Sequence, residues 1–254
     1  MPVIARDKVP KQSQRLGAGS AIFKDEISHG VYPERKDEIL QFVQNDKRQG
    51  VRNDREGQMK KFIFAMSGAS GSIIGVRVIS ELLKTSQIHL IISSQSFSII
   101  RDETGIDWSG KTEAAIEKKI RRYFNSERIY YYNEYNLAAP VSSGSFKTDG
   151  MLIVPCSMKT LSGIANGYAN NLVERAADVT IKEGRTLLLS PREMPFSAIH
   201  LENMLRLAKI GVKIAPPVPG FYHKPENIDD MVDFIAGKIL DSMGIEHKLF
   251  KRWS

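Results

Sequence analysis

The stretch KFIFAMSGASGSIIG, residues 61–75, contains the change of pattern that decides the fold. An apolar run at 62–66 stops at the small residues 67–71, and a second apolar-rich run begins at Ile73. This succession predicts a buried strand, a tight turn and the start of a helix. Glycine lets the backbone approach a ligand closely, and a helix N-terminus presents unpaired N–H groups to an anion. The turn is therefore the first candidate binding element.

Alternating strand and helix patterns continue to the C-terminus. We expect further strands at 88–92, 129–132, 151–154, 186–190 and 212–215, and helices at 96–104, 111–122, 160–166, 171–183, 197–209 and 228–243. This alternation predicts a three-layer α/β fold, in which helices cover both faces of a mostly parallel sheet. Ligands of such sheets bind at the carboxyl ends of the strands.

Composition narrows the classes of protein. The chain has 254 residues, of which 42% are hydrophobic and 26% charged, as expected for one globular domain with a tail. No apolar run approaches the roughly 18 residues of a membrane span, and the N-terminus has no apolar signal core. The single cysteine, Cys156, excludes an internal disulfide and favours a reducing compartment, so we expect a cytoplasmic protein.

The formal net charge of +7 has two interpretations. It describes either a solvated basic surface or a pocket for phosphorylated ligands. Nucleic acid is a less favoured partner, because no recognisable binding motif accompanies the charge.

Residues 1–60 differ from the rest of the chain in composition. They are polar and charged with scattered apolar positions, although 37–43 (DEILQFV) has the pattern of a short amphipathic helix. We expect a charged N-terminal extension, either a partly disordered tail or an arm that packs on a neighbouring subunit. Residues 61–254 are expected to form the ligand-binding domain.

Polar residues follow several predicted strands. Besides the turn at 67–71, they are Ser93, the segment 156–160 and the pair Arg192-Glu193. The turn matches neither the dinucleotide fingerprint nor a Walker A loop, so by itself it fits a plain chain reversal as well as a ligand site. Arg192 is suited to hold a phosphate and Glu193 to move a proton, whereas on the surface the same pair is an ordinary ion pair. Glu103 is a second candidate acid or base, or else a solvated helix-end carboxylate.

Other reactive residue types form no recognisable site. The five histidines lack metal-ligand spacing, so no metal site is predicted. Cys156 has no histidine and asparagine partners in a recognisable pattern, and we interpret it as a small buried residue. The run at 130–132 (YYY) is interpreted as strand packing.

Several stretches together resemble one enzyme family. They are KFIFAMSGASGSIIGVR, VSSGSFKTDGMLIVPCSMKTLSGIANGY, NNLVERAADVTIKEGR, LLLSPREMPFSAIHLENMLRLAKIGV and PPVPGFYHKP. They are similar to the UbiX-type flavin prenyltransferases, whose older label is aromatic acid (3-octaprenyl-4-hydroxybenzoate) decarboxylase. The similarity runs in order from residue 61 to residue 253 and leaves out 1–60.

The resemblance implies a flavodoxin- or Rossmann-like fold that binds FMN. It implies metal-independent transfer of a dimethylallyl group from dimethylallyl phosphate to N5 and C6 of reduced FMN. The product, prenylated FMN, would serve a UbiD-type decarboxylase in ubiquinone biosynthesis or aromatic acid breakdown. Family members form dodecamers whose sites lie between subunits.

The resemblance also assigns residues to roles. The cofactor-binding set is Gly68, Ala69, Ser70, Ser93, Ser157, Met158, Lys159, Thr160 and Arg192. The set expected to bind the prenyl phosphate is Arg175, Lys182, Tyr222 and Lys238, with Tyr135 near the prenyl group. Lys238 stands where the family has an arginine, and Tyr135 where some relatives have a tryptophan. Ser70, Glu103 and Glu193 are the expected catalytic residues that manage proton transfer.

Three other functions compete with this interpretation. A flavin-dependent cysteine decarboxylase would share the fold, but the Arg192-Glu193 pair and the FYHKP segment argue against it. A non-catalytic FMN carrier or assembly subunit would bind the cofactor without turnover. A direct aromatic acid decarboxylase, as the older label states, would need a group that activates the acid, and the sequence offers no obvious one.

Overall fold

The computed structural model describes residues 59–252 of the chain. Most of the predicted N-terminal extension, including the helix expected at 37–43, lies outside the described residues.

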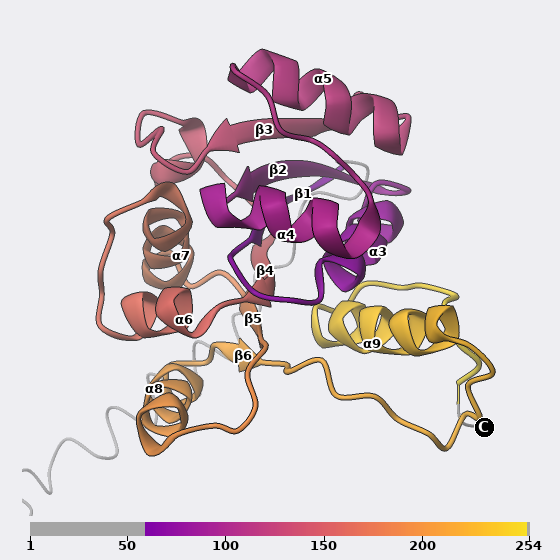
Figure 1. Ribbon diagram of the computed structural model, residues 1–254. Coiled ribbons are helices and arrows are strands. Elements are labelled where there is room, and N and C mark those ends of the chain that lie inside the picture. Colours follow the sequence, from indigo (N-terminus) through magenta and orange to yellow (C-terminus); the bar gives the residue numbers. More distant parts are fainter. Residues whose placement is uncertain (1–58, 253–254) are drawn as a thin grey trace, which may run out of the picture. The chain divides into compact units, whose positions relative to one another are not determined.

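The described chain is built on a parallel sheet (Figure 1). Its strands are β1 (Lys60–Met66), β2 (Ser86–Ile92), β3 (Ile129–Asn133), β4 (Gly150–Cys156), β5 (Leu187–Pro191) and β6 (Lys213–Ile214). They lie side by side in the order β3-β2-β1-β4-β5-β6, and every neighbouring pair is parallel. The chain therefore reverses its direction of travel across the sheet between β1 and β4, the switch point at which open α/β sheets bind ligands.

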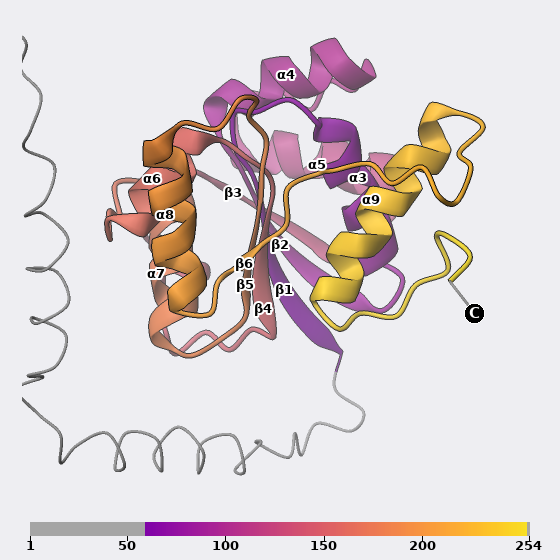
Figure 2. The ribbon, with the colours of Figure 1, turned by 90° about the horizontal axis from the view of Figure 1, so that it is seen from below.

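Helices cover both faces of the sheet (Figure 2). One face carries α3 (Ser72–Leu82), α4 (Ser94–Thr104), α5 (Glu113–Phe124) and α9 (Ile228–Ser242). The other carries α6 (Met158–Ala165), α7 (Leu172–Lys182) and α8 (Ala198–Lys209). The predicted three-layer, flavodoxin- or Rossmann-like α/β fold is confirmed.

Strand β1 shows why its apolar run is continuous. Phe62, Phe64 and Met66 belong to the core beneath α3 and α9, whereas Ile63 and Ala65 belong to the core beneath α6 and α7. Successive side chains of a strand point to opposite faces, so a strand covered on both sides needs apolar residues at every position.

Some boundaries differ from the sequence-based prediction, for local reasons. α5 starts two residues later than expected, because the hydroxyl of Thr112 accepts a hydrogen bond from the N–H of Ala115 and caps the helix. β6 has only two residues, since Pro216 and Pro217 follow closely and have no N–H to donate to a neighbouring strand. A short 3-10 helix, η2 (Pro140–Ser142), lies between β3 and β4, where no helix was predicted.

Helix α3 packs unusually close to the sheet. A Cβ atom added at Gly75 would lie 2.5 Å from the carbonyl oxygen of Val154, so only glycine fits this contact between α3 and β4. The glycine thus fixes how the helix leaves the turn at 67–71.

The outer edge of β3 is covered by side chains from α5. The N–H groups of Tyr131 and Asn133 donate to the carboxylates of Glu117 and Glu113, each at 2.9 Å. Arg121 Nε donates to the carbonyl of Ile129 at 2.9 Å. Exposed strand edges pair readily with other chains, and these contacts occupy the groups that would do so.

None of the helices in residues 59–252 combines the length and the apolar character needed to cross a membrane.

His89 lies in an aromatic cluster at the β2–β3 side of the sheet. Its ring stacks on Tyr130 and Tyr132, with ring centroids 5.3 and 5.8 Å away, and meets the edge of Phe146 at 4.8 Å. Burial, with a smaller contribution from the charge of Lys61, lowers the pKa of His89 from 6.5 to about 4. The folded protein therefore holds this imidazole neutral at pH values where the unfolded chain protonates it.

The His89 imidazole should make stability depend on pH. Its folded pKa lies below its unfolded pKa, so its contribution is complete above about pH 6.5 and is lost as the pH falls toward 4. Urea unfolding at pH 7 and pH 4.5 should give a free energy of unfolding that falls by about 2–3 kcal/mol more in the native protein than in His89→Gln. An equal fall in both proteins would contradict this assignment.

Candidate functional site

A cavity of about 240 Å³ lies at the carboxyl ends of the strands around the switch point. Four strand ends contribute to it, because β1, β2, β3 and β4 are each followed by a residue that lines it. The lining residues are Ser67, Gly68, Ser93, Gln95, Glu134, Ser157, Lys159, Thr160, Asn171 and Val173.

Hydrogen bonds join the turns that follow β1 and β4. The N–H of Ser67 donates to the carbonyl oxygen of Pro155 at 3.1 Å, and the N–H of Ser157 donates to Ser67 Oγ at 2.8 Å. Ser67 is 2% exposed, so these bonds are shielded from water. The two turns therefore form one rigid wall of the cavity.

The N-terminus of α6 opens onto this wall. Ser157 caps the helix, and its Oγ accepts a hydrogen bond from the N–H of Thr160 at 3.3 Å. Lys159 lies exposed in the first turn. The positive end of the helix dipole, a lysine and several hydroxyls together complement an anion such as a phosphate.

Several predicted cofactor-binding residues line this cavity together: Gly68, Ser93, Ser157, Lys159 and Thr160. Ala69, Ser70 and Met158 are their neighbours in sequence but do not line it; Ala69 is buried, Ser70 is exposed and Met158 packs partly against the core. Arg192 follows β5, and its N–H donates to the carbonyl of Cys156 at 3.1 Å. Its exposed side chain thus extends from a backbone that adjoins the end of β4.

The predicted catalytic residues occupy different environments. Glu103 Oε2 accepts hydrogen bonds from the N–H groups of Gly71 at 3.0 Å and Ser72 at 2.8 Å. It therefore caps α3 immediately beside Ser70, where Gly71 adopts a left-handed φ of 99°. Glu193 is exposed after β5, and its carboxylate accepts from the N–H of Met194 at 3.1 Å.

The predicted phosphate-binding residues are not gathered in one chain. On α7, Arg175 donates to the carbonyl of Ser142 at 3.1 Å and to Asp178 at 2.8 Å, and Lys182 pairs with Glu183 at 3.2 Å. Lys182 ends α7, at the opposite end from the cavity-lining Asn171 that caps it.

The other predicted substrate residues lie elsewhere on the chain. Tyr222 is exposed in the segment before α9, and Lys238 is exposed on α9 itself. Helices α7 and α9 cover opposite faces of the sheet (Figures 1 and 2). Tyr135 is 68% exposed just beyond β3.

Sequence reasoning missed several lining residues, which are Gln95, Glu134, Asn171 and Val173, whereas Ser67 lies in the predicted binding turn at 67–71. A signal was available for some of them. Glu134 follows directly on a strand, and Asn171 precedes a helix as its N-cap. The rule that ligands bind beyond strand ends makes Glu134 a candidate, but the rule does not show that β3 lies close enough to the switch point for Glu134 to reach the cavity.

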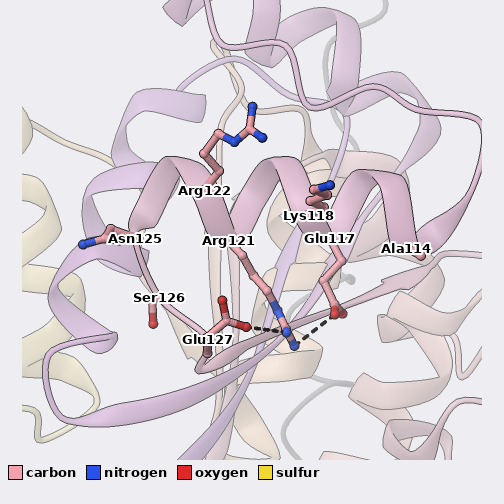
Figure 3. A pocket seen from close by; sticks show the side chains of 8 residues that line it. All are labelled: Ala114, Glu117, Lys118, Arg121, Arg122, Asn125, Ser126 and Glu127. Atoms are coloured by element: carbon pink, nitrogen blue, oxygen red, sulfur yellow. Dashed lines mark hydrogen bonds and ion pairs between the residues drawn. The ribbon is translucent and has the colours of Figure 1, made fainter.

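A larger hollow of about 440 Å³ lies on α5 (Figure 3). Arg121 is engaged there by Glu117 at 2.9 Å and Glu127 at 2.6 Å. Lys118 and Arg122 point away from Arg121 (Figure 3). Because its charged groups diverge or are already paired, this hollow does not form a converging ligand site.

The described residues contain neither a reactive thiol nor a cluster of metal-ligating side chains. Cys156 is fully buried, which confirms its interpretation as a buried residue, and burial raises its pKa to about 12. It is therefore a neutral thiol and a poor nucleophile near pH 7. Over residues 59–252, no group of three or more His, Cys, Asp or Glu side chains is arranged to hold a metal ion.

Comparisons with known proteins agree with this architecture. The Flavoprotein family model matches residues 51–240. A relative from Methanocaldococcus jannaschii named flavin prenyltransferase UbiX is 45% identical over 193 residues, which cover 76% of this chain and 98% of the relative. A relative of the same name from Methanothermobacter thermautotrophicus is 47% identical over 197 residues, 77% of this chain and 96% of the relative. The chain belongs to the UbiX-type flavin prenyltransferase family.

Solved structures of UbiX-type proteins share the fold. A dodecameric FMN-dependent UbiX-like decarboxylase from Escherichia coli O157:H7 matches with a TM-score of 0.67 and 43% identity, over 76% of this chain and 99% of that one. AnUbiX in complex with FMN and dimethylallyl pyrophosphate matches with a TM-score of 0.68 and 38% identity, over 78% of this chain and 98% of that one.

The contacts of Glu103 predict a role in stability. Glu103→Ala removes the acceptor for two N–H groups at the start of α3, so the free energy of unfolding should fall by about 1 kcal/mol. Amide hydrogen exchange at Gly71 and Ser72 should quicken, whereas the exposed neighbour substitution Asp102→Asn should leave it unchanged. Unaltered exchange in Glu103→Ala would show that the carboxylate does not cap α3 in solution.

Proposed function

We propose that this protein transfers a dimethylallyl group from dimethylallyl phosphate to N5 and C6 of reduced FMN and so makes prenylated FMN. The observation that carries the proposal is the cavity at the β1–β4 switch point of a UbiX-type chain, with an anion-binding helix end beside it. One structural neighbour was solved with FMN and dimethylallyl pyrophosphate, which places both kinds of ligand in a close relative.

The residues around the cavity fit FMN. Ser157, Thr160 and Lys159 supply hydroxyls, a helix N-terminus and a positive charge, which suit the FMN phosphate. We assign the rest of the cofactor contact to Gly68, Ala69, Ser70, Ser93, Met158 and Arg192. Bound reduced FMN supplies the electron-rich ring atoms to which the prenyl carbon bonds.

The residues predicted to bind the prenyl phosphate lie far apart within one chain. We propose that Arg175, Lys182, Tyr222 and Lys238 bind the leaving phosphate and offset its growing charge as the C–O bond breaks. Since they lie on opposite faces of the sheet, the site is completed by neighbouring copies in a homo-oligomer. We propose a dodecamer, the assembly of the Escherichia coli neighbour. Tyr135 offers an aromatic face to the developing allyl cation.

We assign proton transfer to side chains that would lie beside the cofactor. Ser70 follows β1 and is exposed, and Glu193 follows β5 and is exposed, so both are accessible to a ligand at the strand ends. Glu103 is bound to the backbone next to Ser70 and therefore also positions that hydroxyl. We assign these three residues the proton movements that accompany ring closure.

The wider setting is part of the same proposal. We propose that prenylated FMN passes to a UbiD-type decarboxylase and that the reaction takes place in the cytoplasm, in keeping with the one buried, unpaired cysteine. Residues 1–60 are proposed to be an extension that adjoins the catalytic domain at 61–254. The relatives support this division, because almost their whole length aligns with only about three quarters of this chain.

A product assay tests the function. The purified protein, mixed with reduced FMN and dimethylallyl phosphate in the presence of EDTA, should form a flavin with the mass and absorbance of prenylated FMN. Glu193→Gln should bind FMN normally but form product about 10²–10⁴-fold more slowly, because proton transfer by a positioned side chain contributes that much.

The exposed Glu202 on α8 provides a matched control, since Glu202→Gln should keep the full rate. Bound FMN without product would instead identify an FMN carrier. Carbon dioxide release from an aromatic acid without a partner protein would identify a direct decarboxylase. A full rate in Glu193→Gln would remove that residue from the catalytic set.

A further inference from the structure

Glu134 is a buried acidic residue in the cavity to which sequence analysis gave no role. It follows β3 directly, is 6% exposed and lines the 240 Å³ cavity with Ser93 and Asn171. A carboxylate in a site built for a phosphorylated cofactor has the wrong charge for the phosphate. It therefore requires a separate explanation.

Hydrogen bonds hold Glu134 in place. Its Oε1 accepts from the N–H of Ser94 at 2.5 Å and from the Ser94 hydroxyl. Its backbone oxygen accepts from the N–H of Leu172 at 2.6 Å, at the start of α7. Glu134 thus connects β3 with the first residues of α4 and α7, and its side chain has little freedom to turn away from the cavity.

The other carboxylate oxygen is available. Among residues 59–252, Oε2 of Glu134 makes no hydrogen bond, and it is not one of the fully buried polar atoms that lack a partner, so it is accessible from the cavity that Glu134 lines. A carboxylate oxygen can only accept hydrogen bonds. A ligand group that meets this oxygen in the cavity must therefore be a hydrogen-bond donor, and like charge disfavours the phosphate at this position.

The lining of the cavity narrows the choice of donor. Serine, threonine and asparagine side chains dominate it, and of the described residues that form it Val173 is the sole aliphatic side chain. A flat tricyclic ring needs apolar contacts, whereas a polyhydroxyl chain suits this lining. The volume of the cavity, about 240 Å³, is also smaller than the roughly 300–1,000 Å³ of pockets that enclose a whole small-molecule ligand, so it suits a part of FMN.

We propose that Glu134 Oε2 accepts a hydrogen bond from a ribityl hydroxyl of the flavin. This contact fixes the direction in which the cofactor binds. The carboxylate repels the phosphate, so the phosphate binds at Lys159 and the N-terminus of α6. The isoalloxazine ring then extends outward toward Ser70 and Arg192. The inference rests on the proposed function, in which FMN occupies this cavity.

Flavin binding by Glu134→Gln tests the proposal. The glutamine oxygen keeps the contacts to Ser94, while an NH₂ group replaces the free acceptor. Dissociation constants measured by fluorescence quenching for FMN, riboflavin and lumiflavin should separate the effects. FMN and riboflavin should each bind about tenfold more weakly than to the native protein, equivalent to about 1.4 kcal/mol, and lumiflavin, which has no ribityl chain, should bind equally well.

Each other outcome overturns the proposal. Unchanged binding of all three flavins would leave Glu134 as a cap for α4 alone. Tighter FMN with unchanged riboflavin would place the carboxylate against the phosphate, and weaker lumiflavin would place it against the ring. Native protein that binds no flavin would instead contradict the proposed function itself. Asp102→Asn, an exposed carboxylate change on α4, is the matched control and should alter none of the constants.

A measurement on the native protein makes the test independent of how the variant folds. Among ribityl-deoxy analogues of riboflavin, one that lacks a single hydroxyl should bind about tenfold more weakly than riboflavin to the native protein. The same analogue should show no such loss with Glu134→Gln. Equal affinity of the native protein for every deoxy analogue would overturn the proposal.

Discussion

The structure depends on the link between the turns that follow β1 and β4. These strands are neighbours in the sheet but far apart in sequence, and the hydroxyl of Ser67 joins them by accepting the N–H of Ser157 at 2.8 Å. Chain connections leave this point in opposite directions, so helices α3 and α6 start from neighbouring turns and cover opposite faces of the sheet, and no crossover fills the gap between these turns. The close contact at Gly75 fixes α3 against β4, and the cap at Ser157 fixes the start of α6, so the helices on both sides of this gap have defined starting points.

Much of this arrangement could be predicted from the sequence, because it depends on local patterns. Continuous apolar runs identified the strands, and polar residues after β1, β2 and β4 identified parts of the cavity wall, such as Ser93 and Ser157. Glu134 and Asn171 were missed for a physical reason. Periodicity shows where strands end but not which strands are neighbours, and the order β3-β2-β1-β4 is what brings these residues to the same cavity.

The residues predicted to bind the prenyl phosphate show what the sequence could not reveal. Arg175 and Lys182 on α7 are occupied by Asp178 and Glu183, and Tyr222 and Lys238 lie across the sheet from them. The sequence alone could not show which of the predicted site residues lie together in one subunit and which would meet only when subunits assemble. In the proposed site, the described chain would hold the cofactor around the β1–β4 link, and neighbouring subunits would complete the binding site for the prenyl phosphate. In this account the acidic residues divide the work, with Glu134 orienting the cofactor, Glu103 holding the turn and Glu193 moving protons.

The most direct test of the central claim is a crystal structure of the protein grown with FMN. The account predicts flavin density at the β1–β4 switch point, with the phosphate near Lys159 and Thr160 and the ribityl chain against Glu134. Flavin bound in the hollow on α5, or in the reverse direction with its phosphate beside Glu134, would contradict it.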